Sequence, residues 1–172
     1  KAVYERIEQM LGSTFLSGAA PDPQIMFAAI GDAKSDRAPL QVGQFESDER
    51  MDNDLSRMWL EEGGGGSGQE SYELFMYMIA RKTLVDAIDK RGKKGLCFIT
   101  GDEAPYPTVS KAEVERIIGD VIADDIATAD IFAELQSRYH TYFIFPASSM
   151  EERQADIDAE IRQRLLKAGG RF

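Results

Sequence analysis

The order of apolar and amphipathic segments is the feature that most constrains the fold of this chain. Near-continuous apolar runs alternate with segments in which apolar side chains recur every three or four residues. The first pattern indicates buried strands and the second indicates helices. Strands that alternate with helices of this length form open, mostly parallel sheets with helices on both faces. We therefore predict an α/β fold with a Rossmann-like sheet.

Four apolar segments are expected to be strands. The run "QIMFAAIGD" predicts a strand near 25–31, and the alternating "LQVGQFE" predicts one near 40–46. The link "AKSDRAP" between them is too short for the crossover that a parallel pair needs. We therefore expect the second strand to be antiparallel to the rest. Further strands are expected near 95–100 and 141–145.

Helices are expected wherever the apolar side chains follow a helical period. Ser47 or Asp48 is a plausible N-cap for the helix that contains Met58 and Trp59 on its apolar face. Ser110, with a glutamate three residues later, has the pattern of a capping box. The predicted helices cover 1–11, 47–62, 70–91, 110–123, 128–139 and 149–170.

Length and composition limit the classes of protein. A chain of 172 residues with 43% hydrophobic content suits one domain, which we expect to cover 1–172. Its net charge of −10 disfavours binding to nucleic acid or to an anionic membrane surface, because both would repel it. No apolar run approaches the roughly 20 residues of a membrane span. The helical pattern at the start has no cap, and "KAGGRF" ends as abruptly, so we expect a truncated piece of a longer polypeptide that carries other domains.

Cys97 is the only cysteine, which excludes an intrachain disulfide and a cysteine-based zinc site. With no disulfide, the sequence favours a cytoplasmic location. Cys97 lies within a predicted strand, where a small buried apolar role is expected. His140, the only histidine, is expected to be an edge or core residue. No G-x-S-x-G elbow is present, and His140 has no identifiable triad companions, so we do not expect an enzyme.

The glycine-rich stretch "EEGGGGSGQESYELF", residues 61–75, allows three interpretations. A flexible linker is disfavoured because the stretch lies between two strongly patterned helices. A phosphate cradle is disfavoured because the neighbouring side chains are Glu61, Glu62 and Glu70, which would repel phosphate. In the third interpretation the glycines allow a tight turn that presents oxygen ligands at the start of the next helix. Such ligands suit magnesium, manganese or calcium.

Further carboxylates follow two of the predicted strands. One strand ends in Asp102 and Glu103, and another ends in Asp32. Ligands of open α/β sheets bind at the carboxyl ends of the strands, so these residues and Ser71 are expected to share one edge as candidate metal ligands. The alternative for Asp32 and Asp102 is that each simply caps a turn.

The segments "GGGGSGQESYELFMYMIA" and "LCFITGDE" resemble the second and third metal loops of the von Willebrand factor type A domain. The resemblance covers about residues 1–146 and is closest to the intracellular type A domains attached to alpha-kinases and to related bacterial proteins. It implies a metal-ion-dependent adhesion site, in which a divalent cation completes its coordination with a carboxylate of a protein partner. The partner is therefore expected to offer a carboxylate or a basic surface.

The resemblance assigns roles to individual residues. Ser71 matches the hydroxyl ligand of the second loop, with Ser67 as its rival, and Asp102 matches the carboxylate of the third loop, with Glu103 as a nearby acid. The first loop of the family, Asp-x-Ser-x-Ser, is absent. We therefore expect that this strand and loop were truncated, left out of the chain, or supplied by another polypeptide. With half of the ligands, the chain alone is expected to bind Mg²⁺, Mn²⁺ or Ca²⁺ weakly.

Two alternatives to a metal-dependent binding module remain. A Rossmann-like, magnesium-dependent phosphohydrolase would use Asp32 and Asp102, with Lys34 and Arg37 as the only cationic candidates near Asp32. A scaffold domain of the same fold would have lost its metal altogether.

Overall fold

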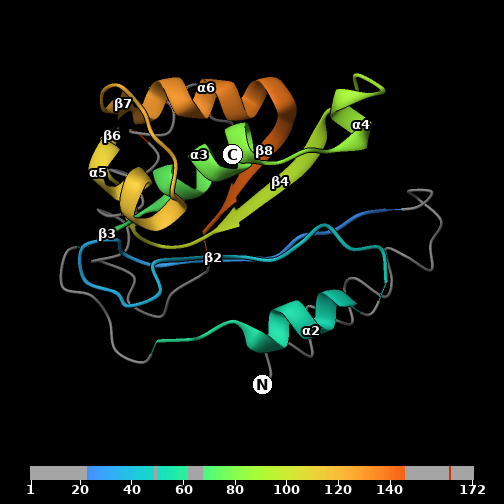
Figure 1. Cartoon of the computed structure of the whole chain (residues 1–172), viewed down its shortest axis with the longest axis horizontal. Helices are drawn as coiled ribbons and strands as arrows, with labels where there is room; N and C mark the ends of the chain where they lie inside the picture. The colour runs from blue at the N-terminus through green and yellow to red at the C-terminus, as the bar shows by residue number, and fades with distance from the viewer. Residues whose placement is uncertain (1–22, 49, 62–67, 146–162, 164–172) are drawn as a thin grey trace. The chain divides into compact units, whose positions relative to one another are not determined.

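The computed structural model of the chain is a mixed α/β structure and describes residues 23–48, 50–61, 68–145 and 163. Figure 1 shows the order of its helices and strands. The chain divides into two compact units, 1–29 with 41–62 and 30–40 with 63–172. The helix predicted over 1–11, the helix predicted over 149–170 apart from residue 163, and the candidate ligand Ser67 lie outside the described residues.

The predicted antiparallel pair is present. Strands β1 (Ala28–Ile30) and β2 (Leu40–Val42) form a two-stranded sheet. An isolated antiparallel bridge between Ile25 and Glu46 extends the pairing beyond the strands. The pair confirms the predicted strands near 25–31 and 40–46, although the regular strands are shorter.

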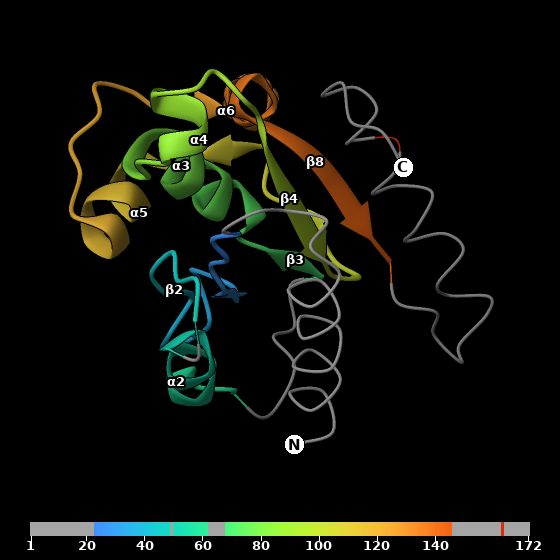
Figure 2. The ribbon, with the colours of Figure 1, turned by 90° about the vertical axis from the view of Figure 1, so that its right-hand side faces the viewer.

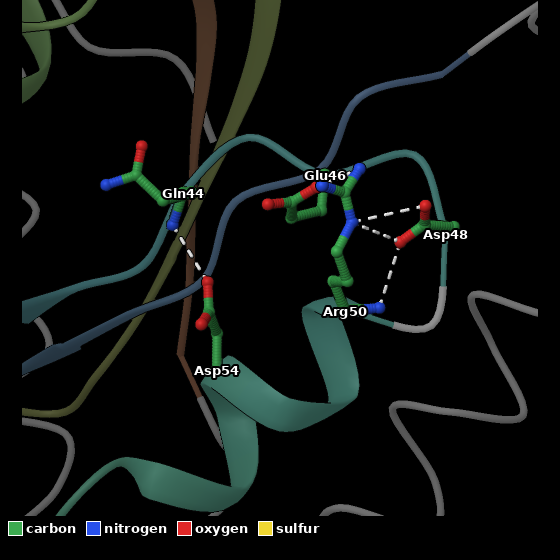
Figure 3. Close-up of polar contacts among 5 residues, drawn as sticks. All are labelled: Gln44, Glu46, Asp48, Arg50 and Asp54. Atoms are coloured by element: carbon green, nitrogen blue, oxygen red, sulfur yellow. Dashed lines mark hydrogen bonds and ion pairs between the residues drawn. The ribbon is translucent and has the colours of Figure 1, made fainter.

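Helix α2 (Arg50–Arg57) buries Met51 and Leu55, which are four residues apart as the helical pattern predicted. Asp54 on this helix accepts a hydrogen bond from the Gln44 N–H at 2.9 Å (Figure 3). A Cβ at Gly43 would lie 2.9 Å from the same carboxylate oxygen, so a larger residue there would force the Asp54 side chain to shift.

The start of α2 is held by charged side chains. The Arg50 N–H donates to Asp48 Oδ1 at 3.0 Å, so Asp48 rather than Ser47 receives the hydrogen bond of a first-turn amide. The Arg50 guanidinium also contacts Glu46 and Asp48 at 2.8 and 2.9 Å (Figure 3). These pairs are largely exposed and are therefore worth little individually.

The predicted helix over 47–62 is wrong beyond Arg57. Trp59 donates its backbone N–H to Gln41 Oε1, and Gln41 Nε2 donates to the Trp59 carbonyl, each at 2.8 Å. These two bonds to β2 replace the helical hydrogen bonds. They also leave the Trp59 side chain 63% exposed, although the helical period placed it on the buried face.

The second unit contains the longest strands. Strands β4 (Gly95–Thr100) and β8 (Tyr139–Ile144) pair in parallel, with Gly95 opposite Tyr139. Helices α3 (Tyr72–Lys82) and α6 (Thr128–Arg138) lie on the same side of this pair in Figure 2. Both strands are confirmed, and β8 begins two residues before the predicted 141.

Two further strand pairs are short. Strand β3 (Gln69–Glu70) pairs in parallel with β5 (Ala104–Pro105), and β6 (Thr108–Val109) pairs antiparallel with β7 (Ile126–Ala127). Across residues 23–48, 50–61 and 68–145, the strands therefore form separate two-stranded sheets. The open Rossmann-like sheet remains a prediction.

The helix predicted over 70–91 is wrong in its extent, because it is interrupted at Thr83. The Thr83 hydroxyl donates to the Ile79 carbonyl at 2.6 Å, and the Thr83 backbone is extended. This β-branched residue thus ends α3 by competing for the last-turn carbonyl. A short helix α4 (Asp86–Asp89) follows, and Gly92 with φ 62° comes after it.

The helix predicted over 110–123 begins as expected and ends early. The Glu113 N–H donates to Ser110 Oγ at 3.5 Å, as the capping-box pattern predicted. Helix α5 (Lys111–Glu113) continues into a π-helical turn η1 (Val114–Ile118). Gly119 then takes the left-handed conformation with φ 75°, which ends the helical run.

Candidate functional site

Asp32 organises the turn after β1. Its side chain is 1% exposed. Oδ1 accepts hydrogen bonds from the Lys34 N–H at 2.9 Å and from the Tyr106 hydroxyl at 3.0 Å, and Oδ2 accepts from the Ser35 hydroxyl at 3.0 Å. Both carboxylate oxygens therefore satisfy donors within the protein. These contacts are those of a turn-capping aspartate.

Ser71 connects this turn to the start of α3. The Ser71 side chain is fully buried, and its Oγ accepts a hydrogen bond from the Ala33 N–H at 2.9 Å. The Ser71 N–H donates to the Gly31 carbonyl at 3.1 Å. Although Ser71 occupies the N-cap position of α3, its side chain makes no capping hydrogen bond. Its hydroxyl instead fastens residues 31–33 to the helix.

The parallel pair β3–β5 brings the two loops named by the family resemblance together. Gln69 lies opposite Ala104, and Glu70 lies opposite Pro105. Gly68, with φ 63°, is so close to the other loop that a Cβ there would lie 3.6 Å from Glu103 Oε2. The segment 68–71 that follows the glycine run thus meets the segment that contains Asp102 and Glu103.

Negative charge gathers at this meeting point. Burial, followed by the charges of Asp36, Asp32, Glu103 and Asp102, raises the pKa of Glu70 to about 7. Glu70 Oε2 is buried and has no hydrogen-bond partner. We call Asp36, Glu70, Asp102 and Glu103 the acidic edge. With a pKa near neutral pH, Glu70 is present in both its charged and neutral forms, because burial and the neighbouring carboxylates both disfavour its charged form.

The third loop lies directly against the first residue of α3. A Cβ at Gly101 would overlap the Tyr72 hydroxyl, so the backbone there can approach only as glycine. Burial and the nearby Glu70 raise the pKa of Tyr72 above its usual range. Tyr72 also packs edge-on against Phe143, with ring centroids 5.3 Å apart. Tyr72 therefore contacts both the loop that begins at Gly101 and the aromatic side chain of Phe143 on β8.

Glu73 is a buried ionisable residue that the sequence analysis did not identify. The side chain is fully buried in the first turn of α3, and burial raises its pKa to about 8. Glu73 Oε2 accepts a hydrogen bond from the Tyr106 N–H at 3.2 Å, whereas Oε1 has no partner. The sequence feature that indicates burial of Glu73 is its position between Tyr72 and Leu74. A glutamate with apolar neighbours on both sides lies in a segment that has little solvent-exposed surface.

Two cationic side chains near Asp32 make contacts within the protein. Lys34 Nζ lies 3.6 Å from the centroid of the Tyr106 ring, a cation–π contact. Arg116 Nη2 donates to the Ala33 carbonyl at 2.7 Å. Both groups therefore stabilise the turn and the loop that packs on it.

The candidate ligands differ in how well they fit a divalent cation. Asp32 and Ser71 are buried and hydrogen-bonded to the turn, which does not fit an open coordination site. Asp102 is exposed, and Glu70 has a buried oxygen without a partner, which fits a hydrated cation bound through few protein oxygens. Within the described part of the chain, no group of three or more histidine, cysteine, aspartate or glutamate side chains is arranged to hold a metal ion.

The two residues expected to have ordinary structural roles lie on the long strands. Cys97 on β4 is buried, and burial raises the pKa of its thiol to about 12, so it stays a protonated, unreactive thiol. This confirms the expected apolar role. His140 on β8 is exposed and lies opposite Leu96.

The sequence matches no protein-family model, no curated protein and no solved structure. None of the helices in the described ranges is both long and apolar enough to cross a membrane.

Proposed function

We propose that this chain is a binding module of the von Willebrand factor type A kind, which engages a protein partner through a divalent cation at the acidic edge. The observation that carries the proposal is the parallel pairing of β3 with β5. It joins the end of the glycine-rich loop to the loop of Asp102, and these are the two segments on which the family resemblance rests. The open, mostly parallel sheet of that family is part of the same proposal.

The acidic edge and the turn 31–36 have different roles in this proposal. Asp102 and Glu70 are the carboxylates that would hold the cation, with Glu103 beside them. A bound Mg²⁺ or Mn²⁺ would supply positive charge and open coordination positions for a partner's carboxylate. Asp32 and Ser71 act as positioning residues, because their hydrogen bonds hold the turn 31–36 against the start of α3. This modifies the role that the resemblance gives Ser71.

The acidic edge supports a cation because its carboxylates repel one another. The raised pKa of Glu70 reflects burial first and that repulsion second. A cation would relieve the repulsion and displace the proton of Glu70, so its affinity should rise as the pH increases through about 7. Few protein ligands leave most of the coordination shell to water, which predicts dissociation constants on the order of millimolar for the chain alone.

The first test is calorimetric titration of Mg²⁺ or Mn²⁺ into the parent chain and into Asp102→Ala. Asp102→Ala should lower the affinity at least about tenfold, which corresponds to about 1.4 kcal/mol. Asp124→Ala is the matched control, because Asp124 is also exposed and lies outside the acidic edge. A further titration at pH 6 and pH 8 should show tighter binding at pH 8. Equal affinity in the parent and Asp102→Ala would exclude the metal mechanism.

The second test measures partner capture by a longer protein that includes an upstream Asp-x-Ser-x-Ser segment. Capture in the presence of magnesium should be lost in chelator and in Asp102→Ala, but not in Asp124→Ala. Capture that is indifferent to both chelator and Asp102→Ala would favour the metal-free scaffold. The phosphohydrolase alternative is less well supported, because the Asp32 carboxylate is buried and accepts three hydrogen bonds from the protein.

A further inference from the structure

The long strand β4 has one edge that no other strand occupies. Within the described ranges, the sheet that contains β4 consists of β4 and β8 alone (Figure 2). Parallel strands normally lie inside larger sheets. An edge strand presents a row of unpaired backbone N–H and C=O groups, which is a template for pairing with a further strand. The edge of β4 that faces away from β8, called the open edge below, is therefore a candidate interaction surface.

The backbone groups of alternate β4 residues point to the open edge. The Gly101 N–H donates to the Ile144 carbonyl at 3.2 Å, so the backbone of Gly101 is directed towards β8. Successive residues of a strand direct these groups to opposite sides, so those of Leu96, Phe98 and Thr100 are directed to the open edge. In the part of the chain that the structure describes, they have no hydrogen-bond partner.

The sequence of β4 contains nothing that would keep an edge strand from pairing. Proteins protect such edges with charged side chains, proline or β-bulges. Residues 95–100 read GLCFIT, contain neither a charge nor a proline, and pair with β8 in unbroken register. Leu96 and Phe98 are 64% and 58% exposed. Strand β4 is thus an apolar edge strand that is suited to pairing.

Charges of opposite sign flank the two ends of β4. Lys93 and Lys94 come immediately before the strand, and Asp102 and Glu103 come shortly after it. The side chains of Lys93, Lys94 and Asp102 are exposed. A strand with a basic start and an acidic end is complementary to a second copy of itself when the two copies run antiparallel. Two-fold symmetry produces this arrangement, because each basic start then meets the acidic end of the other copy.

The second edge of the pair, on β8, offers no such complementarity. Arg138 before this strand already donates to the Thr83 carbonyl and forms an ion pair with Asp89. The strand ends in Ile144, and the apolar residue Phe145 follows. A second copy is therefore expected on β4.

The hydrogen-bonding groups select one register. In an antiparallel pair, two residues that exchange both hydrogen bonds lie directly opposite each other. Leu96, Phe98 and Thr100 pair fully with their counterparts only when Phe98 lies opposite Phe98 of the second copy. Leu96 then lies opposite Thr100, and Lys94 lies opposite Asp102. Lys94 Nζ donates to the Gln136 carbonyl at 2.7 Å, but this contact is exposed, so the side chain can turn to Asp102 at little cost.

We propose that two copies of this chain associate through the open edges of β4, antiparallel and centred on Phe98, with Lys94 of each copy opposite Asp102 of the other. The two-stranded sheets thereby become one sheet of four strands, and the two Phe98 rings form a cross-strand aromatic pair. The association goes beyond the proposed cation binding and requires no cation. A cation on Asp102 would compete with Lys94 for the same carboxylate, so the test is made in chelator.

The first measurement is sedimentation of the parent chain in chelator. The parent should pass from monomer to dimer between about 1 and 100 μM, the range expected for an interface of modest size. Lys94→Glu and Asp102→Lys each place like charges opposite each other twice in the dimer, so each should lower the dimer affinity at least about tenfold. Arg57→Glu is the matched control, because Arg57 is exposed and lies outside β4, and it should leave the dimer unchanged.

Mixing the two variants tests the register itself. A dimer of one Lys94→Glu chain and one Asp102→Lys chain has opposite charges in both contacts. An equimolar mixture should therefore regain the dimer that each variant lacks. Damage to the fold cannot produce this result, because mixing two damaged proteins would not restore either. Circular dichroism spectra establish that each variant is folded.

Hydrogen exchange tests the use of the backbone. The amides of Leu96, Phe98 and Thr100 should exchange at least about tenfold more slowly in the dimeric parent than in Lys94→Glu. The Cys97 amide is the internal control, because its backbone is directed towards β8 and should be equally protected in both proteins.

Several results would overturn the proposal. A parent chain that stays monomeric to about 100 μM has no such interface. A dimer that both charge variants leave intact uses another surface, and a mixture that stays monomeric contradicts the register. Slow exchange of the Phe98 amide in a monomer would mean that the edge is covered within one chain. If either charge variant does not fold, Phe98→Glu replaces it, since it places two carboxylates together at the centre of the interface, and a dimer that survives Phe98→Glu would also count against the proposal.

Discussion

The buried carboxyl group of Glu73 should make the stability of this protein depend on pH. Glu73 is fully buried, and its pKa is raised from 4.5 to about 8. Between these values the folded chain keeps a proton that the unfolded chain has released. The stabilisation linked to Glu73 is therefore complete below pH 4.5 and is lost as the pH rises through about 8. Each pH unit in this window lowers the free energy of unfolding by about 1.4 kcal/mol, which gives a total on the order of 5 kcal/mol.

Glu73→Gln removes this titration and keeps the size of the side chain. The amide retains an oxygen that can accept the Tyr106 N–H, so the variant should stay folded. Near pH 5 its stability should be equal to or below that of the parent. Near pH 9 the free energy of unfolding of the variant should exceed that of the parent by an amount on the order of 4 kcal/mol, because the folded parent then contains a buried charged carboxylate.

The assay is urea unfolding followed by far-UV circular dichroism at pH 5, 7 and 9. Glu115→Gln is the matched control, because Glu115 is exposed on η1 and loses the same charge. Its pH dependence should follow that of the parent. If Glu73→Gln also follows the parent, Glu73 ionises freely in the folded protein, and the argument from its burial is wrong.

Two further predictions concern close packing of the backbone. Gly101→Ala should lower the free energy of unfolding by about 1–3 kcal/mol, since the new methyl group would overlap the Tyr72 hydroxyl. Adding Tyr72→Phe should restore part of that loss in a double-mutant cycle measured by urea unfolding. Strictly additive effects of the two substitutions would contradict the overlap. Asp54→Ala should cost about 1 kcal/mol in thermal unfolding because it removes the acceptor of the Gln44 N–H, whereas Asp52→Ala on the exposed side of α2 should cost almost nothing.

Local sequence patterns were sufficient for several elements. The apolar runs located β4 and β8, although buried and exposed side chains alternate along most of each strand, so the run predicted the strand and not burial of both its faces. The short link 33–39 predicted the antiparallel arrangement of β1 and β2, since no crossover fits into it. The spacing of Ser110 and Glu113 predicted a helix start that the structure contains.

Helix ends depended on interactions with residues far away in the sequence. The pattern after Arg57 is compatible with a longer helix, but Gln41 binds the backbone of Trp59 and ends the regular structure. Thr83 ends α3 through the Ile79 carbonyl, and its hydroxyl also lies 3.2 Å from that of Tyr139. The differences in helix propensity among residues are smaller than the free energy that such hydrogen bonds contribute. A helix predicted from apolar periodicity alone is therefore too long where such a bond ends it.

The same distinction applies to the candidate site. The sequence by itself determined which acidic side chains follow the strands and the glycine run, because turn chemistry and strand ends are local properties. Only the tertiary structure decided that Asp32 and Ser71 face inward to hold a turn, that Glu73 is buried, and that Glu70 shares its surroundings with Asp102. The physical reason is that hydrogen-bond partners and burial are set by segments about 35 residues or more apart, such as β3 and β5, whose pairing no local pattern records.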